Sequence, residues 1–250
     1  MPRHHIMQEL GITVSRSDRE LHGAVTVTPY LCVPGTPHLR TSILASFADM
    51  IEGLLAAQFM APRVPVTLEL DVHLYRPAPA TGKVTAVGRT VKAGRSVFVA
   101  EVEFFDGREE PFAFSAGSFM AAPDARLTLP ALTSVDMSPL DATLTMPLAD
   151  RAGCKRQQPG VAVLPRSEDG LNASDTVNGG LIALAAEEAA LSLLPGETLS
   201  SLQLRYLQPV RVGPAVATAT VRAGIGRVEL RDSGRDDRLA VIATTRTFCG

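Results

Sequence analysis

This chain of 250 residues has few cysteines and almost no excess of charge of either sign. The three cysteines (Cys32, Cys154 and Cys249) are odd in number and lack metal-ligand spacing, which excludes a disulfide framework and favours reduced thiols. The formal net charge is −2 at pH 7, so the sequence has no electrostatic footprint for nucleic acid. No apolar run reaches transmembrane length without a charge, and the first residues lack the apolar core of a signal peptide. We therefore expect a cytoplasmic protein with no nucleic-acid partner, no membrane span and no metal.

Two helix-like segments stand out among the hydrophobic residues, which make up 46% of the chain. They are ILASFADMIEGLLAAQF at residues 43–59 and LIALAAEEAALSLL at residues 181–194. Each is apolar on every side, and a helix that is apolar all round is buried all round. Each also contains acids, and a buried acid needs a partner or a function. Asp49 in the first segment and Glu187 in the second are therefore candidate functional residues.

The segments around these two helices follow the same order in both halves. In the first half the pattern predicts a strand at 21–28, a helix at about 39–60, and strands at 66–75, 83–92, 95–105 and 112–120. In the second half it predicts a strand at 160–164, a helix at 179–194, and strands at about 199–207, 215–223, 226–231 and 239–248. Recurrent prolines between the halves indicate a connector, with a few ordered turns at most.

This order predicts an α+β fold of tandem units, in which a curved antiparallel sheet wraps round each long central helix. The enclosing sheet explains why each helix is apolar all round. Two such units would join their sheets edge to edge, which covers exposed strand edges. The expected divisions are residues 1–122, a connector at 123–157, and residues 158–250.

Several motifs on these elements are similar to those of hotdog-fold acyl-CoA thioesterases. Residues 66–77 have the form VT-x-x-L-x-V-x-x-x-RP, and a Gly94-Arg95 turn follows. Asn172, Asn178-Gly179-Gly180 and Glu187 resemble the N-x5-H-G-G-x6-D/E pattern of phenylacetate-type thioesterases, with Asn178 where that family usually has His. The resemblance covers about residues 20–122 and 158–249. It implies a tandem double hotdog that hydrolyses an acyl-CoA to a free acid and coenzyme A, with coenzyme A as part of the substrate and no other cofactor.

The spacing within the second helix decides how such a site is assembled. Gly179 and Glu187 are eight residues apart, which is roughly 12 Å along a helix axis. One thioester carbonyl cannot easily contact both residues. The amide and the acid of one site should therefore come from different helices, lying antiparallel across the seam between the halves. This agrees with the composite sites that the resemblance implies.

That crossing predicts one working site, with Asp49 and Thr67 from the first half and the glycine turn from the second. The Gly179 N–H, helped by Asn172, would stabilise the oxyanion at a helix N-terminus. Asp49 would act as general base or nucleophile, and Thr67 falls where the resemblance implies a Ser or Thr that helps to orient the water. Further substrate contacts are expected from Asn178, Gly180, Arg95 and Lys92, the last two near the phosphates of coenzyme A.

The other crossing predicts a degenerate second site. Here Glu187, with Ser200 or Ser201, would face Pro34, Arg40 and Thr41. Proline has no amide side chain, and threonine is a poor replacement for glycine at a turn that a substrate approaches.

Structural interpretations of the same residues remain open at this stage. In the structural interpretation, Asp49 and Glu187 are hydrogen-bonded to backbone at a kink in the helix, or they are exposed on its one solvent-facing edge. Asn172 is equally suited to a turn, and Arg95 and Lys92 to a solvated surface. The neighbouring acids Glu52 and Glu188 are interpreted as solvated or paired.

Three other functions compete with thioester hydrolysis. One is non-catalytic binding of acyl-CoA or a fatty acyl group, and another is a purely structural tandem. A hydratase or dehydratase of the same fold is disfavoured, because the Gly-Asp-x-Asn-Pro-x-His run of the hydratases is absent from the sequence. The expected partner is a small acyl-CoA molecule, and two tandem chains would be able to pair as a homodimer. The sequence does not identify the acyl group.

Overall fold

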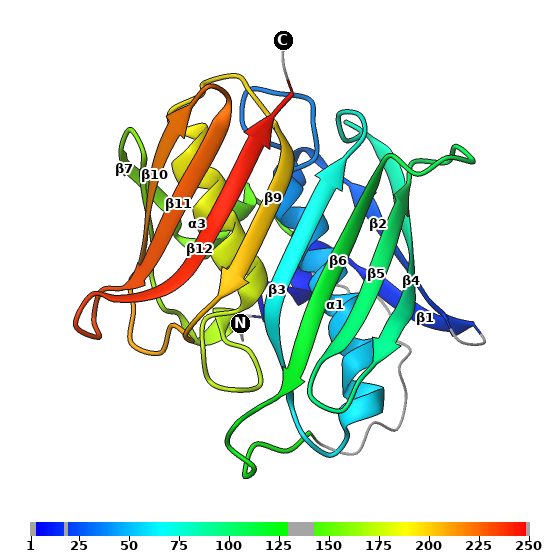
Figure 1. Cartoon of the computed structure of the whole chain (residues 1–250). Helices are drawn as coiled ribbons and strands as arrows, with labels where there is room; N and C mark the ends of the chain where they lie inside the picture. Colours follow the sequence, from blue (N-terminus) through cyan, green and yellow to red (C-terminus); the bar gives the residue numbers. More distant parts are fainter. Residues whose placement is uncertain (1–3, 18–19, 130–142, 249–250) are drawn as a thin grey trace.

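In the computed structural model, which describes residues 4–17, 20–129 and 143–248, twelve strands form one antiparallel sheet. The strand order is β1-β2-β4-β5-β6-β3-β9-β12-β11-β10-β8-β7 (Figure 1). The elements of the first half are β1 (Thr13–Ser17), β2 (Glu20–Val27), α1 (Thr41–Met60), β3 (Pro65–Leu74), β4 (Gly82–Ala93), β5 (Phe98–Phe105) and β6 (Ala113–Ala121). Those of the second half are α2 (Leu148–Ala152), β7 (Lys155–Gln158), β8 (Val161–Leu164), α3 (Gly179–Leu191), β9 (Leu199–Tyr206), β10 (Ala215–Arg222), β11 (Ile225–Asp232) and β12 (Arg238–Thr247).

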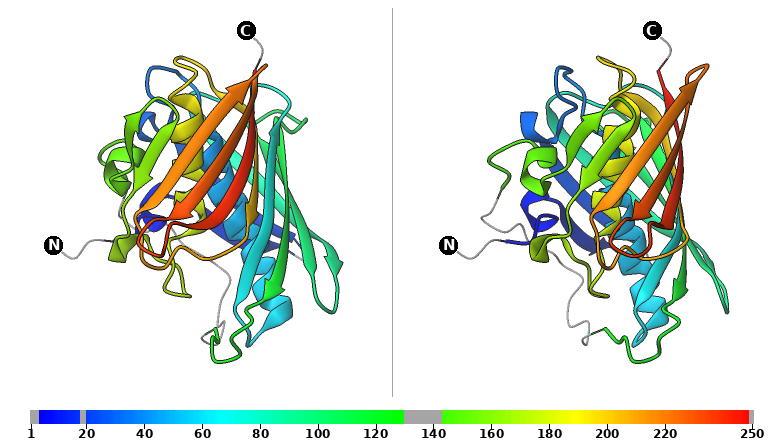
Figure 2. Two further views of the ribbon diagram at one scale, coloured as in Figure 1. Left: turned by 60° about the vertical axis from the view of Figure 1, so that its left-hand side comes forward. Right: turned by 90° about the vertical axis from the view of Figure 1, so that its left-hand side faces the viewer.

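The two long helices lie on the concave side of this sheet, which curves round them (Figure 2). Both faces of α1 are consequently buried, including Ile43, Phe47 and Ile51 at 0% exposure. The helix ends before Pro62, because the residue that precedes a proline is disfavoured in the α conformation and Ala61 is extended instead. By length and mean hydropathy (1.4) α1 would also suit a membrane span, but most of it is buried within the protein, as is typical of a core helix.

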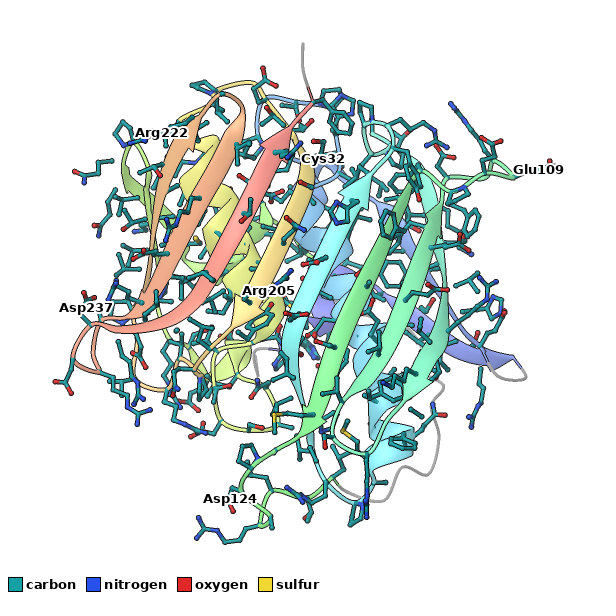
Figure 3. The ribbon with its side chains drawn as sticks, in the orientation of Figure 1. Cys32, Glu109, Asp124, Arg205, Arg222 and Asp237 are labelled. Atoms are coloured by element: carbon teal, nitrogen blue, oxygen red, sulfur yellow. The ribbon has the colours of Figure 1, made fainter. Side chains whose placement is uncertain are left out.

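The two halves of the sheet meet where β3 pairs with β9. Glu69 lies opposite Arg205 and Val72 opposite Leu202 in this antiparallel register. Arg205 also forms a salt bridge across the seam with Asp71 and another with Glu69, and it is labelled at this junction in Figure 3. The expected edge-to-edge joining of the sheets is therefore confirmed.

The two long helices run antiparallel against each other. Contacts join Thr41 to Glu187 at one end, while Gly179 lies near Asp49 at the other. As residue numbers rise along α1, those of the facing residues on α3 fall. Each helix N-terminus is thereby placed against the middle of the other helix, which is the arrangement that the spacing argument requires.

The connector and the N-terminal segment are more ordered than the sequence pattern suggests. Strands β1 and β7, which the pattern did not predict, form the outer edges of the sheet. Helix α2 lies within the predicted connector and buries its apolar residues Leu148, Ala149 and Ala152 in the hydrophobic core. Residues 130–142 of the connector, and Cys249, lie outside the described residues.

Candidate active site

The central acid of the site is Asp49, half-buried in the middle of α1. The Thr67 hydroxyl, near the start of β3, donates a hydrogen bond to Asp49 Oδ1 at 2.8 Å. Burial raises the pKa of Asp49 above its ordinary value, and the hydrogen bond from Thr67 offsets part of that rise. The predicted pair of Asp49 and Thr67 is thus brought together, and the second carboxylate oxygen remains to face the cavity.

A backbone donor faces this acid from the N-terminus of α3. Asn178 is the N-cap, and its Oδ1 accepts from the Gly180 N–H at 2.8 Å. Among the described residues, none accepts from the Gly179 N–H. A Cβ at Gly179 would lie 3.4 Å from Asp49 Oδ2, so only glycine leaves room for a third group between the two helices. The free N–H and the positive end of the helix dipole together favour an anion here.

A residue that the sequence analysis missed, Tyr206, completes this corner. Its hydroxyl at the end of β9 donates to the Gly179 carbonyl at 3.2 Å, and it lies 3.3 Å from where a Gly179 Cβ would be. Burial and the nearby Asp49 carboxylate raise the pKa of Tyr206 well above its ordinary value, so it stays protonated. Both halves have a tyrosine shortly before a proline at the end of the strand after the long helix, and this repeat could have pointed to Tyr206. The corresponding residue of the first half, Tyr75, is 64% exposed and has no such role.

These groups line a cavity of about 1030 Å³. Asp49, Thr67, Gly179, Asn178 and Tyr206 all contribute to its wall. Apolar side chains from α1, the segment before β3, β6 and the connector line one part of it, namely Met50, Leu54, Val64, Phe119, Leu127 and Leu129. Polar side chains of two loops line another part, namely Asn172, Ser174, Thr176, Gln208 and Arg211. The cavity is therefore amphipathic, with the acid and the free N–H on its wall.

Asn172, predicted to help the oxyanion donor, and Gly180, predicted to contact the substrate, both have structural roles. The Asn172 carboxamide oxygen accepts from the Ser174 and Thr176 backbone N–H groups at 2.9 and 3.2 Å, so it holds its own loop, although the residue still lines the cavity. Gly180 is buried against Ser46 and is not part of the cavity wall; a Cβ there would lie 2.2 Å from Ser46 Oγ. Gly180 is required by the close crossing of the helices.

The prediction for Arg95 and Lys92 is also corrected. Both are exposed at the turn between β4 and β5, and neither lines the cavity. The turn extends beyond the sheet because β4 and β5 form a long hairpin. The basic side chains that do line the cavity are His5 and Arg211. Arg211 lies in the loop between β9 and β10, where its backbone N–H donates a hydrogen bond to Asp232. No motif in the sequence indicated this position.

The second crossing of the helices is filled by its own acid. Glu187 Oε1 accepts from the backbone N–H groups of Thr41 and Ser42 at 2.9 and 3.3 Å, and Oε2 accepts from the Ser42 hydroxyl at 2.6 Å. Arg40 Nη1 donates to the same Oε2 at 3.1 Å. Glu187 and Arg40 are fully buried, and neither lines the cavity. The Glu187 carboxylate therefore occupies the N-terminus of α1, whereas at the first crossing the Asp49 carboxylate leaves the Gly179 N–H of α3 without an acceptor among the described residues.

Further ion pairs surround this closed crossing. Arg40 Nη2 lies 2.6 Å from Glu188 Oε1, and Arg156 Nε donates to Glu188 Oε2 at 2.6 Å. The paired state expected for Glu188 is confirmed. Within the part of the chain that the structure describes, neither Ser200 nor Ser201 hydrogen-bonds to Glu187, because the Ser42 hydroxyl and the N-terminus of α1 already satisfy the carboxylate. The expected role for Ser200 is therefore wrong.

The length of the acid side chain and the residues at the helix start explain why the two crossings differ. Glu187 has one more methylene than Asp49 and reaches the N–H groups of the opposite helix. At the open crossing Asp49 is held back by Thr67, and the Asn178 side chain takes the Gly180 N–H, which leaves that of Gly179.

Glu52 is neither solvated nor paired, contrary to expectation. It is fully buried on α1, and its two carboxylate oxygens have no hydrogen-bond partner among the described residues. Burial raises the pKa of Glu52 well above its ordinary value. It contacts β6, where a Cβ at Gly117 would lie 1.9 Å from Glu52 Oε2. Glu52 therefore lies in the core between α1 and β6, and it does not line the cavity.

Known proteins share parts of this sequence and most of this fold. Residues 39–113 match the family model described as thioesterase superfamily. An acyl-ACP thioesterase from Bacteroides thetaiotaomicron has a TM-score of 0.65 at 12% identity, covering 92% of this chain and 98% of its own. A 12:0-ACP thioesterase from Umbellularia californica has a TM-score of 0.63 at 12% identity, covering 94% of this chain and 99% of its own.

At such low identities the likeness of the two structures shows a common fold alone. No curated protein sequence matches the chain significantly. The family match nevertheless spans α1, β3, β4 and β5, and so includes both Asp49 and Thr67. Residues 39–113 are thus similar to the thioesterase superfamily, and nearly the whole chain shares its fold with these two thioesterases.

Proposed function

We propose that the chain hydrolyses the thioester bond of an acyl-CoA at the crossing of α1 and α3. One observation carries the proposal: on the wall of one large cavity, the Asp49 carboxylate lies beside Gly179, whose N–H has no acceptor among the described residues. A general base and an oxyanion donor are the two groups that hydrolysis of an acyl group needs. The proposal also treats each long helix and its surrounding strands as one unit of a double hotdog.

The reaction follows from the positions of these groups. The thioester carbonyl oxygen accepts from the Gly179 N–H, while Asp49 removes a proton from a water held beside it. Hydroxide attacks the carbonyl carbon, and the developing negative charge is stabilised by the N–H and the N-terminus of α3. The tetrahedral intermediate then collapses, the carbon–sulfur bond breaks, and the coenzyme A thiolate receives the proton from Asp49. Direct attack by Asp49, followed by hydrolysis of the anhydride, uses the same carboxylate.

The polar part of the cavity supports binding of the pantetheine arm. Asn172, Ser174, Gln208 and Arg211 supply donors and acceptors there, and these suit the amides of pantetheine. Both structural neighbours named above act on acyl-ACP, which carries the same arm, so the arm itself does not distinguish the carriers. We choose acyl-CoA as the substrate, and the test includes both.

The function is tested by measuring release of free thiol from a panel of acyl-CoAs and the matching acyl-ACPs. The proposal predicts turnover of acyl-CoAs. Tight binding of acyl-CoA with no thiol release would instead support an acyl-binding protein. Turnover restricted to acyl-ACP would retain the chemistry and overturn the choice of carrier.

The activity of the wild-type protein should depend on pH through Asp49. Only the carboxylate accepts a proton, so activity is present above the pKa of Asp49 and is lost as the pH falls through it. Because burial raises this pKa, the acidic limb of kcat/KM should lie above about pH 3.9, the ordinary value for aspartate. A profile of kcat/KM against pH measures the limb directly. A limb at or below the ordinary value would contradict the assignment.

Replacing Thr67 with valine should move that limb to higher pH. The hydroxyl bonds to the charged form of Asp49 and lowers its pKa. Hydrogen bonds to charged groups contribute about 1.5 kcal/mol, which corresponds to a shift of about one pH unit. The measurement is the same pH profile, with Thr67→Ser as the control that keeps the hydroxyl and the limb. An unshifted limb in Thr67→Val would show that Thr67 does not act on the catalytic carboxylate.

A further inference from the structure

The apolar part of the cavity follows one face of α1. Asp49, Met50, Gly53, Leu54 and Ala57 all line the cavity, and their spacing places them on a single side of the helix. No charged residue of α1 lines it beyond Asp49 in the C-terminal direction. The other charged groups on the wall, Asp124 and Arg211, lie in exposed loops; Figure 3 shows Asp124 in the loop that follows β6. The cavity therefore continues from the reacting groups as an apolar groove along the helix.

Gly53, in the middle of this groove, has no packing explanation. Glycine is the poorest helix former after proline, so its presence inside α1 needs a reason. Glycines elsewhere in the core are required by contact, since a Cβ at Gly88 would lie 2.2 Å from Ile51 and one at Gly117 would lie 1.9 Å from Glu52. A Cβ at Gly53 would meet only Phe119, at 3.9 Å. The space that its missing side chain leaves belongs to the cavity.

The length of the groove indicates what fits in it. Asp49 and Ala57 are eight residues apart, which is about 12 Å along the helix axis. With carbon–carbon bonds of about 1.5 Å in a zigzag, an extended alkyl chain advances about 1.3 Å per carbon. The groove from Asp49 to Ala57 therefore accommodates about nine carbons. Val64, Leu127 and Leu129 also line the cavity, at the junction of the connector with the end of α1.

We propose that this groove binds the acyl group, that the substrate class is a straight-chain aliphatic acyl thioester of about eight to twelve carbons, and that Gly53 sets the length accepted. The inference depends on the proposed hydrolysis at Asp49. The thioester carbonyl lies at Gly179, and the alkyl chain passes over Gly53 toward Ala57. Each methylene buried in the groove raises kcat/KM about fourfold until the groove is full.

The test is kcat/KM for an acyl-CoA series from two to sixteen carbons, in wild type and in Gly53→Leu. Wild type should rise to about ten carbons and then level off. In Gly53→Leu the values for two to four carbons should stay within about threefold of wild type, because the reacting groups are untouched. The values for ten carbons and above should fall at least about tenfold, since a buried leucine removes the space of several methylenes. Gly53→Ala adds a single methyl group and is the matched graded variant, which should lower the values for ten carbons and above by about fourfold, less than Gly53→Leu does.

A second variant keeps the test decisive if Gly53→Leu does not fold. Ala57 lies one further turn from Asp49, so Ala57→Leu should shorten the accepted chain less than Gly53→Leu does. Wild type that releases thiol with no dependence on chain length, or folded variants whose profiles parallel wild type, would overturn the inference and leave the proposed hydrolysis intact. No thiol release from any acyl-CoA or acyl-ACP would overturn the proposed function itself.

Discussion

Replacing Asp49 with asparagine is expected to lower kcat by at least about 10²-fold, the usual contribution of a general base. The amide keeps the volume of the side chain and its hydrogen bond to Thr67, but it does not accept a proton from water. The measurement is thiol release by the purified variant under saturating acyl-CoA, with circular dichroism to establish the fold. A turnover rate near that of wild type would remove Asp49 from the mechanism.

The matched control is Glu187→Gln at the equivalent position on α3. Glu187 is enclosed by Arg40, Thr41 and Ser42 and does not line the cavity. Its variant should therefore turn over substrate within a few-fold of wild type per folded molecule, although with lower stability. The reverse result, an inactive Glu187→Gln beside an active Asp49→Asn, would show that the open and closed crossings have been assigned the wrong way round.

Replacing Arg40 with methionine is expected to destabilise the protein by about 3–5 kcal/mol. Arg40 is fully buried and forms ion pairs with two carboxylates. Its Nη1 lies 3.1 Å from Glu187 Oε2 and its Nη2 lies 2.6 Å from Glu188 Oε1. Removing one partner of a buried ion pair leaves uncompensated charge in a low-dielectric interior, which accounts for this magnitude. Urea unfolding measures the loss. A change below about 1 kcal/mol would contradict the account of the closed crossing as a buried ionic cluster.

A compensated variant separates the charge effect from lost packing. Apolar replacements of similar volume at Arg40, Glu187 and Glu188 together should recover most of the loss, because no unpaired buried charge then remains. Both variants should keep kcat per folded molecule near wild type, because the reacting groups lie at the opposite crossing. A loss of kcat in the folded compensated variant would show that the closed crossing takes part in the reaction.

Local patterns in the sequence predicted the two buried helices, most of the strands and the placement of Asp49 near Gly179. Hydrophobicity on all sides of α1 and α3 required an enclosing sheet, and the eight residues between Gly179 and Glu187 required a partner helix. From these two arguments the antiparallel crossing and the proximity of Asp49 to Gly179 follow. Thr67 was predicted from the resemblance to hotdog-fold thioesterases, which have a Ser or Thr at the start of the strand that follows the acid-bearing helix.

The sequence patterns did not predict which side chains contact each other between separate elements. Tyr206 contacts Gly179 only because of how β9 passes the start of α3, and no local motif encodes that approach. Likewise the extra methylene of Glu187 was visible, but its contact with the N–H groups of the opposite helix depends on how closely the helices cross. Glu52 was misjudged because burial of an acid beside Gly117 depends on the packing of β6 against α1.

The most direct measurement of the open crossing is a crystal structure with a non-hydrolysable ketone analogue of a ten-carbon acyl-CoA, in which a methylene replaces the sulfur. We predict that the analogue's carbonyl oxygen accepts from the Gly179 N–H at about 2.9 Å, with Asp49 beside the carbonyl carbon and the alkyl chain along Gly53. A carbonyl bound at Thr41 and Ser42, or anywhere out of reach of Asp49, would contradict the account.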